Sequence, residues 1–209
     1  LRIFPASEHH HSYPFIFEYD GNTYCLPESF ESNALKLYRW DRSKKQFVFE
    51  KVLMENVQLA DPTICEIAGR WWLFCTHKTL SNTALYLYHA STPFGPFKEH
   101  ANNPVKWDIR SARPAGHPFE QDGKWYRPAQ DCSTSYGSKI VLNEIDEITP
   151  DSFREHAVQS VEPVPPYDHG LHTISRFGNK TLVDGKGYRF SSAQFWFQLK
   201  RKFSRLLGR

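Results

Sequence analysis

A motif of about fifty residues recurs along this chain, and it limits the possible folds more than any other feature. Each copy holds a short apolar run, a turn that contains glycine, and a second run rich in aromatic residues. The turn glycines are Gly21, Gly69, Gly123 and Gly178, at spacings of 48, 54 and 55 residues. Glycine readily adopts the positive φ that tight hairpin turns require, so each copy is predicted to form a β-hairpin.

Two further strands are expected after each complete hairpin, because the apolar runs there alternate with polar residues at period two. These runs cover residues 35–40 and 47–53, residues 85–90 with a short piece near Phe97, and residues 139–145 with 153–161. Four antiparallel strands in each repeat are typical of a propeller blade. The chain is therefore predicted to be all-β, with three full blades and the opening hairpin of a fourth. A β-sandwich is the alternative.

A five-bladed ring needs about one more blade, which we expect before Leu1. Residues 1–190 are assigned to the propeller and residues 191–209 to a basic tail. Apolar residues from Phe195 to Leu207 fall on one face at helical spacing, so the tail is expected to contain a short amphipathic helix. Residues 195–209 either lie on an anionic membrane surface or pack their apolar stripe against protein.

The net charge of +3 is a property of this tail. Residues 195–209 contain five Lys or Arg and no acid, so the remaining residues hold 21 basic against 23 acidic side chains. A body this close to neutral gives no reason to expect a nucleic-acid partner.

The cysteines indicate neither a metal centre nor a disulfide framework. Cys25, Cys65, Cys75 and Cys132 form no Cys-x-x-Cys pair, and the adjacent histidines at 9–11 cannot all face one ion, so no metal or cofactor is expected. A reducing compartment is the simpler interpretation, which predicts a cytoplasmic protein, peripheral at a membrane if the tail attaches there. No run of about 18 apolar residues is present, so no transmembrane helix is expected.

Six short phrases occur in a fixed order. They are His11-Ser12-Tyr13-Pro14-Phe15, Leu26-Pro27-Glu28-Ser29, Asp61-Pro62-Thr63-Ile64, Trp72-Leu73-Phe74, Ser91-Thr92-Pro93-Phe94-Gly95-Pro96-Phe97, and Gln130-Asp131-Cys132 with Tyr136-Gly137. Together they resemble the N-terminal domain of the glucosamine inositolphosphorylceramide transferases and its bacterial relatives, over roughly residues 10–190. That domain looks like the five-bladed propellers of glycoside hydrolase family 43.

In the plant transferases, sugar transfer is attributed to a separate C-terminal glycosyltransferase domain. The resemblance therefore implies that this domain has a carbohydrate-binding or accessory role in glycan or glycolipid biosynthesis. The family pattern also opens with an Ala-Asp-Pro-Phe-like strand, where family 43 hydrolases place their catalytic base, and this sequence has no such strand. Residues 113–117 hold Arg113 and His117 where a family 43 enzyme offers its acid Glu. This exchange argues against a standard two-carboxylate hydrolase and suits an anionic glycan.

Three residues are candidates for catalysis. Propellers present the starts of their innermost strands around the channel, so Asp61 is the best carboxylate, as a base or an orienting partner. Glu28 follows the second strand of the first hairpin and is expected to point into the mouth. His117 is able to donate a proton near neutral pH. The plainer alternatives are a strand-start turn cap for Asp61 and an ordinary loop carboxylate for Glu28.

Further residues are candidates for contact with a sugar. They are Tyr13, His77, Arg113, Gln130, Asp131, Tyr136, His169 and His172. The polar group after the third hairpin either bonds sugar hydroxyls or ties down its loop, and His77 is alternatively a surface histidine. Four residues that begin the repeats are predicted to converge on the propeller axis: Tyr13, Asp61, His117 and His172.

Three classes of function follow from these patterns. The leading hypothesis is a carbohydrate-binding or accessory propeller with a carbohydrate or glycolipid ligand. The second is an enzyme, a glycoside hydrolase or glycosyltransferase that acts on an anionic glycan. The third is a non-catalytic, membrane-associated scaffold.

Overall fold

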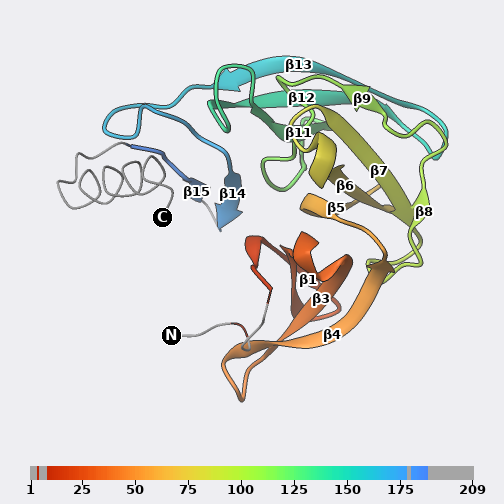
Figure 1. The fold of residues 1–209 in the computed structure, drawn as a ribbon. Helices are drawn as coiled ribbons and strands as arrows, with labels where there is room; N and C mark the ends of the chain where they lie inside the picture. The colour runs from red at the N-terminus through yellow and green to blue at the C-terminus, as the bar shows by residue number, and fades with distance from the viewer. Residues whose placement is uncertain (1–3, 5–8, 178–179, 188–209) are drawn as a thin grey trace, which may run out of the picture.

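The computed structural model describes residues 4, 9–177 and 180–187. Three β-sheets fan around a common centre, and a two-stranded hairpin follows them (Figure 1). Within each sheet the first strand lies toward the centre and the later strands lie progressively farther out. Three full blades and the opening hairpin of a fourth are thereby confirmed in the described part of the chain. The predicted C-terminal helix and the tail at 191–209 lie outside the described residues.

The strand bounds are as follows. Blade 1 contains β1 (Ser12–Tyr19), β2 (Asn22–Glu28), β3 (Ala34–Asp41) and β4 (Gln46–Glu55). Blade 2 contains β5 (Leu59–Ile67), β6 (Arg70–His77), β7 (Ala84–Ala90), β8 (Lys98–Glu99) and β9 (Lys106–Trp107). Blade 3 contains β10 (Phe119–Gln121), β11 (Lys124–Asp131), β12 (Lys139–Ile148) and β13 (Phe153–Val161). The last hairpin is β14 (Ile174–Phe177) and β15 (Lys180–Val183).

The predicted hairpin turns form because both central residues adopt positive φ. The pairs are Asp20-Gly21, Ala68-Gly69 and Asp122-Gly123, with φ between +48° and +76°. This is the backbone geometry of the two-residue turns that match the twist of neighbouring strands. The turn chemistry that was visible in the sequence therefore sets the register of the three inner hairpins.

The outer strand of blade 2 differs from the prediction of a single short piece near Phe97. It is split into β8 and β9, which both pair with β7. Between them, Asn103 replaces a ladder partner: its side chain accepts from Leu87 N at 2.8 Å and donates to Leu87 O at 2.7 Å. A side-chain amide thus satisfies the backbone where the strand is interrupted.

The core lies between the blades, and the two faces of the central hairpin serve different neighbours. Ile64 and Leu73 belong to a cluster with residues of blade 1. Cys65 and Trp72, one position along, belong to a cluster against which Trp125 of blade 3 packs. Successive side chains of a strand point to opposite faces, so alternate residues of this hairpin pack against blade 1 on one face and blade 3 on the other.

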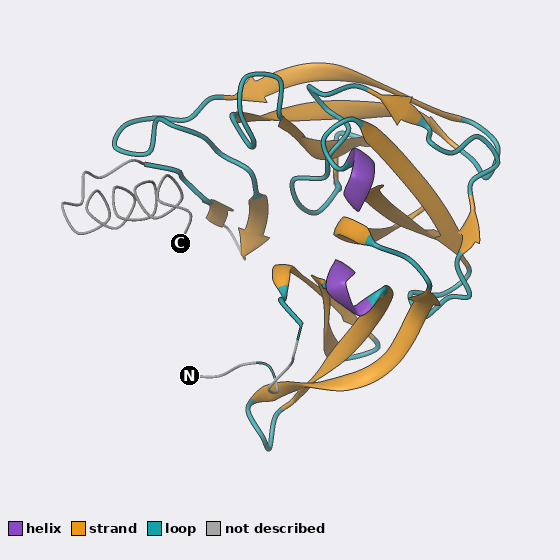
Figure 2. Cartoon of the chain, viewed as in Figure 1, coloured by secondary structure: helices purple, strands orange, loops and turns teal. Residues whose placement is uncertain are grey.

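The ends of the inner strands meet at one end of the blades, where a site can form. Because neighbouring strands are antiparallel, the first strand of each blade starts at the same end where the second strand finishes. Two short helical turns, η1 (Phe30–Ser32) and η2 (Lys78–Leu80), follow β2 and β6 at this end (Figure 2). No helix within the described residues is long and apolar enough to cross a membrane.

Candidate functional site

The repeat places one polar residue of each blade at the same level, near the end of its second strand. These residues are Glu28, Thr76 and Gln130, each seven positions after its turn glycine. Glu28 lies opposite Ser12 and Thr76 opposite Ala60 in their ladders, while Gln130 N donates to Arg113 O at 2.8 Å. The internal symmetry therefore brings the polar ends of three blades toward one point.

Asp61 occupies that point and contacts all three blades. Its Oδ2 accepts from Arg113 Nε at 2.5 Å and from Gln130 Nε2 at 2.8 Å. Its backbone N–H donates to Glu28 Oε2 at 2.9 Å. We call Glu28, Asp61, Arg113 and Gln130 the axial cluster. Because Asp61 has φ +48° at a shift in the ladder register, its carboxylate is turned out of the regular strand pattern.

Burial dominates the electrostatics of the axial cluster. Asp61 is 3% exposed, and desolvation raises its pKa to about 6. The Arg113 guanidinium opposes this rise, while the neighbouring Glu28 adds to it. Desolvation acts to lower the pKa of Arg113, but the adjacent Asp61 carboxylate reverses the direction and the net shift is upward. One cation thus serves two carboxylates, and burial favours the protonated form of Asp61 more than in a free aspartate.

Arg113 is held by the protein itself. Its Nη1 donates to Asn82 Oδ1 at 3.1 Å, and Nη2 lies 3.9 Å from Glu28 Oε2. The guanidinium also stacks over the Tyr136 ring, 4.8 Å from the ring centre. The sequence suggested that Arg113 would bind an anionic ligand, whereas in the structure it faces two carboxylates of the chain. The positive charge of Arg113 therefore orients the carboxylates of Asp61 and Glu28 within the axial cluster.

A pocket of about 330 Å³ is lined by Tyr136, the residue whose ring also contacts Arg113 of the axial cluster. The lining residues are Tyr136, Gly137, Gly170, His172, Asp184, Gly185 and Lys186. Tyr136 is 46% exposed, and its ring meets the His172 ring edge to face at 5.5 Å. Partial desolvation raises the pKa of Tyr136 to about 12, so its hydroxyl stays protonated. The pocket therefore combines the aromatic ring of Tyr136 with polar side chains.

Asp184 fixes one wall of the pocket. It forms an ion pair with His172 Nδ1 and accepts from the backbone N–H groups of His172 at 3.0 Å and Thr173 at 2.6 Å. Desolvation acts to raise the pKa of Asp184, but these hydrogen bonds prevail and bring it to about 2. The carboxylate therefore stays ionised and holds the His172 ring against Tyr136.

Tyr13 lies beside the axial cluster, as expected of the residue that begins the first repeat. Its hydroxyl bonds Thr63 Oγ1 at 2.8 Å, which links the first two blades. Burial raises the pKa of Tyr13, and the nearby Asp61 carboxylate adds to the rise. Its φ of +44° repeats the distortion seen at Asp61.

His117 does not share the level of Tyr13 and Asp61, contrary to the prediction from the sequence. Its ring stacks on Phe15 at 5.3 Å, two positions along β1 from Tyr13. Nδ1 donates to Pro118 O at 2.5 Å, so the neutral ring carries its proton there. Partial desolvation lowers its pKa, although over a third of the residue stays exposed. His117 lies six positions before its turn glycine, whereas Tyr13 and Asp61 lie eight positions before theirs, so His117 is closer to the turn.

Three other candidates have local partners outside the axial cluster. His77 bonds the Tyr88 hydroxyl at 3.0 Å and packs on Tyr86. Asp131 accepts from Ser133 N at 2.8 Å and Oγ at 2.6 Å, so it ties down its loop. His169 is exposed and pairs with Asp168 at 3.0 Å.

Sequence reasoning missed four residues that complete the site. Ser12 donates to Glu28 Oε1 at 3.0 Å, and counting from the hairpin turn would have placed it there. Asn82, Asp184 and Lys186 lie in irregular segments, where no periodic signal assigns a position. Their roles depend on contacts between residues far apart in the sequence.

One group of potential metal ligands lies elsewhere among the described residues. The ligand atoms of Glu144, Asp146 and His156 are within 4.8 Å of one another on β12 and β13. His156 pairs with Asp146 at 3.0 Å and Lys124 with Glu144 at 2.8 Å. These ion pairs already explain the grouping.

Comparison with known sequences gives a consistent result. The family model described as "Glucosamine inositolphosphorylceramide transferase 1, N-terminal" matches residues 1–165. A protein of Oryza sativa subsp. japonica, named glucosamine inositolphosphorylceramide transferase 1, is 36% identical over 152 residues. The match covers 70% of this chain and 20% of that relative. The chain thus spans about a fifth of the length of the curated relatives it matches.

Two solved structures with a similar fold are carbohydrate-active enzymes. An exo-β-1,3-galactanase from Phanerochaete chrysosporium has a TM-score of 0.57 at 10% identity, covering 85% of this chain and 44% of that chain. An arabinanase from Bacillus subtilis has a TM-score of 0.55 at 14% identity, covering 86% and 66%. At these identities the likeness concerns the fold alone. It confirms a β-propeller of the five-bladed, glycoside hydrolase family 43 kind.

Proposed function

Because the chain belongs to the family of glucosamine inositolphosphorylceramide transferase 1 N-terminal domains, we propose that it is a carbohydrate-binding domain of a protein that acts on glycans or glycolipids. One observation carries the proposal. The Tyr136 pocket presents an exposed aromatic ring beside the Asp184 carboxylate, the His172 imidazole and Lys186, and the same ring covers Arg113 of the axial cluster.

The chemistry of this surface suits a sugar. The apolar face of a sugar ring packs on an aromatic side chain, and the hydroxyls need donors and acceptors at its edge. Tyr136 supplies the ring, and His172, Asp184 and Lys186 line the same pocket. A pocket of this size falls within the range of small-molecule sites. The proposed ligand is therefore one sugar residue of a glycan or of a glycolipid head group.

Hydrolysis or sugar transfer is the second candidate, and the raised pKa of Asp61 is the observation that favours it. The surroundings of Asp61 count against it. The two carboxyl groups of a glycosidase flank the scissile bond, whereas Glu28 and Asp61 are both bonded to neighbouring protein groups and buried. Asp61→Ala separates the two candidates, because saccharide turnover that persists in this variant excludes Asp61 as the catalytic group.

Binding is tested on a glycan array with neutral, amino and acidic saccharides, followed by calorimetry on the best one. We expect Tyr136→Ala to weaken binding about tenfold or more, since it removes the ring platform. Phe49→Ala is the matched control, because Phe49 is a 55% exposed ring on the outer strand of blade 1. Equal affinity of wild type and Tyr136→Ala, or no array binding, would reject the proposal.

Attachment to a membrane and a cytoplasmic location stay predictions from the sequence. The basic, aromatic residues 195–209 would hold the propeller on an anionic surface, where a glycolipid head group is within reach. Flotation with vesicles that contain anionic lipid tests this. The prediction requires that the chain floats and that a variant with the five cations of 195–209 changed to Gln does not.

A further inference from the structure

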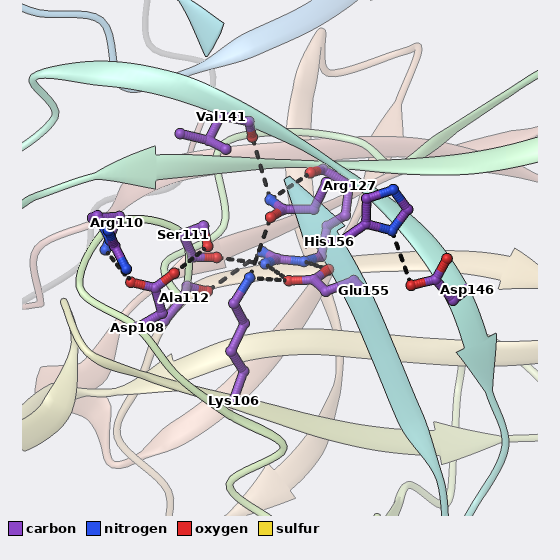
Figure 3. Close-up of polar contacts among 11 residues, drawn as sticks. Lys106, Asp108, Arg110, Ser111, Ala112, Arg127, Val141, Asp146, Glu155 and His156 are labelled. Carbon is purple, nitrogen blue, oxygen red and sulfur yellow. Dashed lines mark hydrogen bonds and ion pairs between the residues drawn. The ribbon is translucent and has the colours of Figure 1, made fainter. Parts of the chain in front are cut away.

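A second buried ion cluster lies mostly in blade 3, behind the segment that leads to Arg113, and receives Lys106 from β9 of blade 2. Arg127 on β11 bonds Glu155 on β13 twice, from Nε to Oε2 at 2.8 Å and from Nη2 to Oε1 at 2.5 Å. Both side chains are 1% exposed. Lys106 donates to Glu155 Oε1 at 2.7 Å and to Asn143 Oδ1 at 3.2 Å (Figure 3). We call these four residues the blade-3 cluster.

The Arg127 guanidinium also reaches the backbone that precedes the axial cluster. Its Nη2 donates to Ser111 O at 2.5 Å, and Nη1 donates to Ala112 O at 3.4 Å. Figure 3 shows Ser111 and Ala112 beside this guanidinium. The next residue is Arg113, whose Nε bonds the Asp61 carboxylate. The two clusters are therefore joined by one short stretch of chain.

We propose that Arg127 is a positioning residue, which holds the carbonyls of Ser111 and Ala112 so that Arg113 reaches Asp61. The inference rests on the proposed function, since it assigns Arg127 to keeping the carbohydrate site in its binding geometry. A lysine would not replace it. Only arginine presents several N–H donors in a fixed fork, which here serves a carboxylate and two carbonyls at once.

Stability alone gives a weak reason to keep this ion pair. Replacing a buried ion pair by apolar residues of similar volume is often neutral or stabilising. An apolar side chain at 127 would fill the space but donate nothing to the carbonyls of Ser111 and Ala112. The donors, rather than the charge, distinguish arginine from such a residue at this position.

Other contacts also hold this stretch and the residues after it. Ala112 N donates to Asp108 O at 2.8 Å, and Ser111 Oγ donates to Asp108 Oδ2 at 2.9 Å. The β11 ladder holds Arg113 itself, since Gln130 N donates to Arg113 O at 2.8 Å, and it continues with Ala115 N to Pro128 O at 3.1 Å. Among the described contacts, the carbonyls of Ser111 and Ala112 receive their side-chain donors from Arg127. The experiment must therefore separate Arg127 from the ladder.

The test compares Arg127→Lys with Lys106→Met. Arg127→Lys keeps the charge beside Glu155 but loses the fork to the carbonyls. Lys106→Met removes the other cation of the same cluster and leaves the fork intact. The readouts are the titration of the Asp61 carboxyl by NMR and the affinity for the best array saccharide. We expect Arg127→Lys to raise the pKa of Asp61, as Arg113 withdraws, and to weaken binding about tenfold. Lys106→Met should match the wild type in both.

If Arg127→Lys does not fold, the triple variant Arg127→Met, Glu155→Leu and Lys106→Met replaces all three charged side chains of the cluster by apolar ones and serves instead. A folded variant of either kind in which Asp61 titrates as in the wild type overturns the proposal. So does a Lys106→Met variant that shifts Asp61 equally, because that result indicates general loosening. Absence of saccharide binding by the wild type rejects the proposed function, while the Asp61 titration still decides the role of Arg127.

Discussion

The axial cluster and the blade-3 cluster are both built on an arginine bonded to a buried carboxylate, yet their charge balance is opposite. In the axial cluster, Arg113 serves both Asp61 and Glu28, and desolvation raises the pKa of Asp61 to about 6. In the blade-3 cluster, Arg127 and Lys106 both serve Glu155. Desolvation again acts to raise the pKa of that carboxyl, but the two cations reverse the shift.

The two clusters also differ in hydrogen bonding: the side-chain groups of one are fully paired, whereas the other retains an unpaired acceptor. Both Glu155 oxygens are bonded, and no atom of the blade-3 cluster is among the described buried side-chain atoms that lack a partner. Gln130 Oε1 of the axial cluster is among them. Buried polar groups are normally satisfied, and exceptions concentrate at functional positions. The cluster with too few partners is the better candidate for contact with a ligand.

The largest expected effect concerns the blade-3 cluster. Glu155→Ala leaves the buried Arg127 and the partly buried Lys106 without their carboxylate and should lower the free energy of unfolding by about 3 to 5 kcal/mol. Urea denaturation measures this change. Glu162→Ala is the control, because the Lys139–Glu162 pair is on the surface and should contribute within about 0.5 kcal/mol. Similar losses in both variants would refute the contrast drawn between buried and exposed pairs.

An intermediate effect is expected from the pH dependence of Asp61→Asn. The unfolded Asp loses its proton near 3.8 and the folded Asp61 near pKa 6, so the folded state retains a proton between these values. The stability that Asp61 contributes is therefore full below about pH 4 and is lost as pH rises through 6. Between pH 4 and 7, the unfolding free energy of wild type relative to Asp61→Asn should fall by on the order of 2 to 3 kcal/mol. A constant difference would contradict the raised pKa.

The smallest effect tests the join between the first two blades. Tyr13→Phe removes the hydroxyl that bonds Thr63 and should cost about 1 kcal/mol in unfolding free energy. Tyr19→Phe is the comparison, since the ring of Tyr19 packs on Trp71 and Phe94 and remains in the variant. A larger loss in Tyr19→Phe than in Tyr13→Phe would show that the hydroxyl contact at the centre is not a significant join.

The sequence predicts the blades well, because their signals are local. Glycines at 21, 69 and 123 mark turns with positive φ, and period-two alternation marks the strands between them. The split between β8 and β9 was not predictable in this way. It depends on the Asn103 side chain meeting the backbone of Leu87, sixteen residues away.

The site is predicted less completely than the fold. Asp61, Glu28 and Gln130 come together because the repeat places them at equivalent heights, so the pattern identified them. His117 was misplaced because the alignment followed the His-Pro pair, although His117 lies two positions nearer to its turn glycine than Tyr13 and Asp61 do. Asp184 and Asn82 depend on loop geometry, and a local pattern does not encode which distant side chain a loop residue meets.

The most direct test maps the bound saccharide on the protein by NMR. The account predicts that the best array saccharide shifts the amide signals of residues 133–137 and 170–173 and the side chain of Arg113. The signals of Arg127 and Glu155 should stay unchanged. Shifts confined to the hairpin turns at 20–22, 68–70 and 122–124, at the opposite end of the blades, would contradict binding at the Tyr136 pocket.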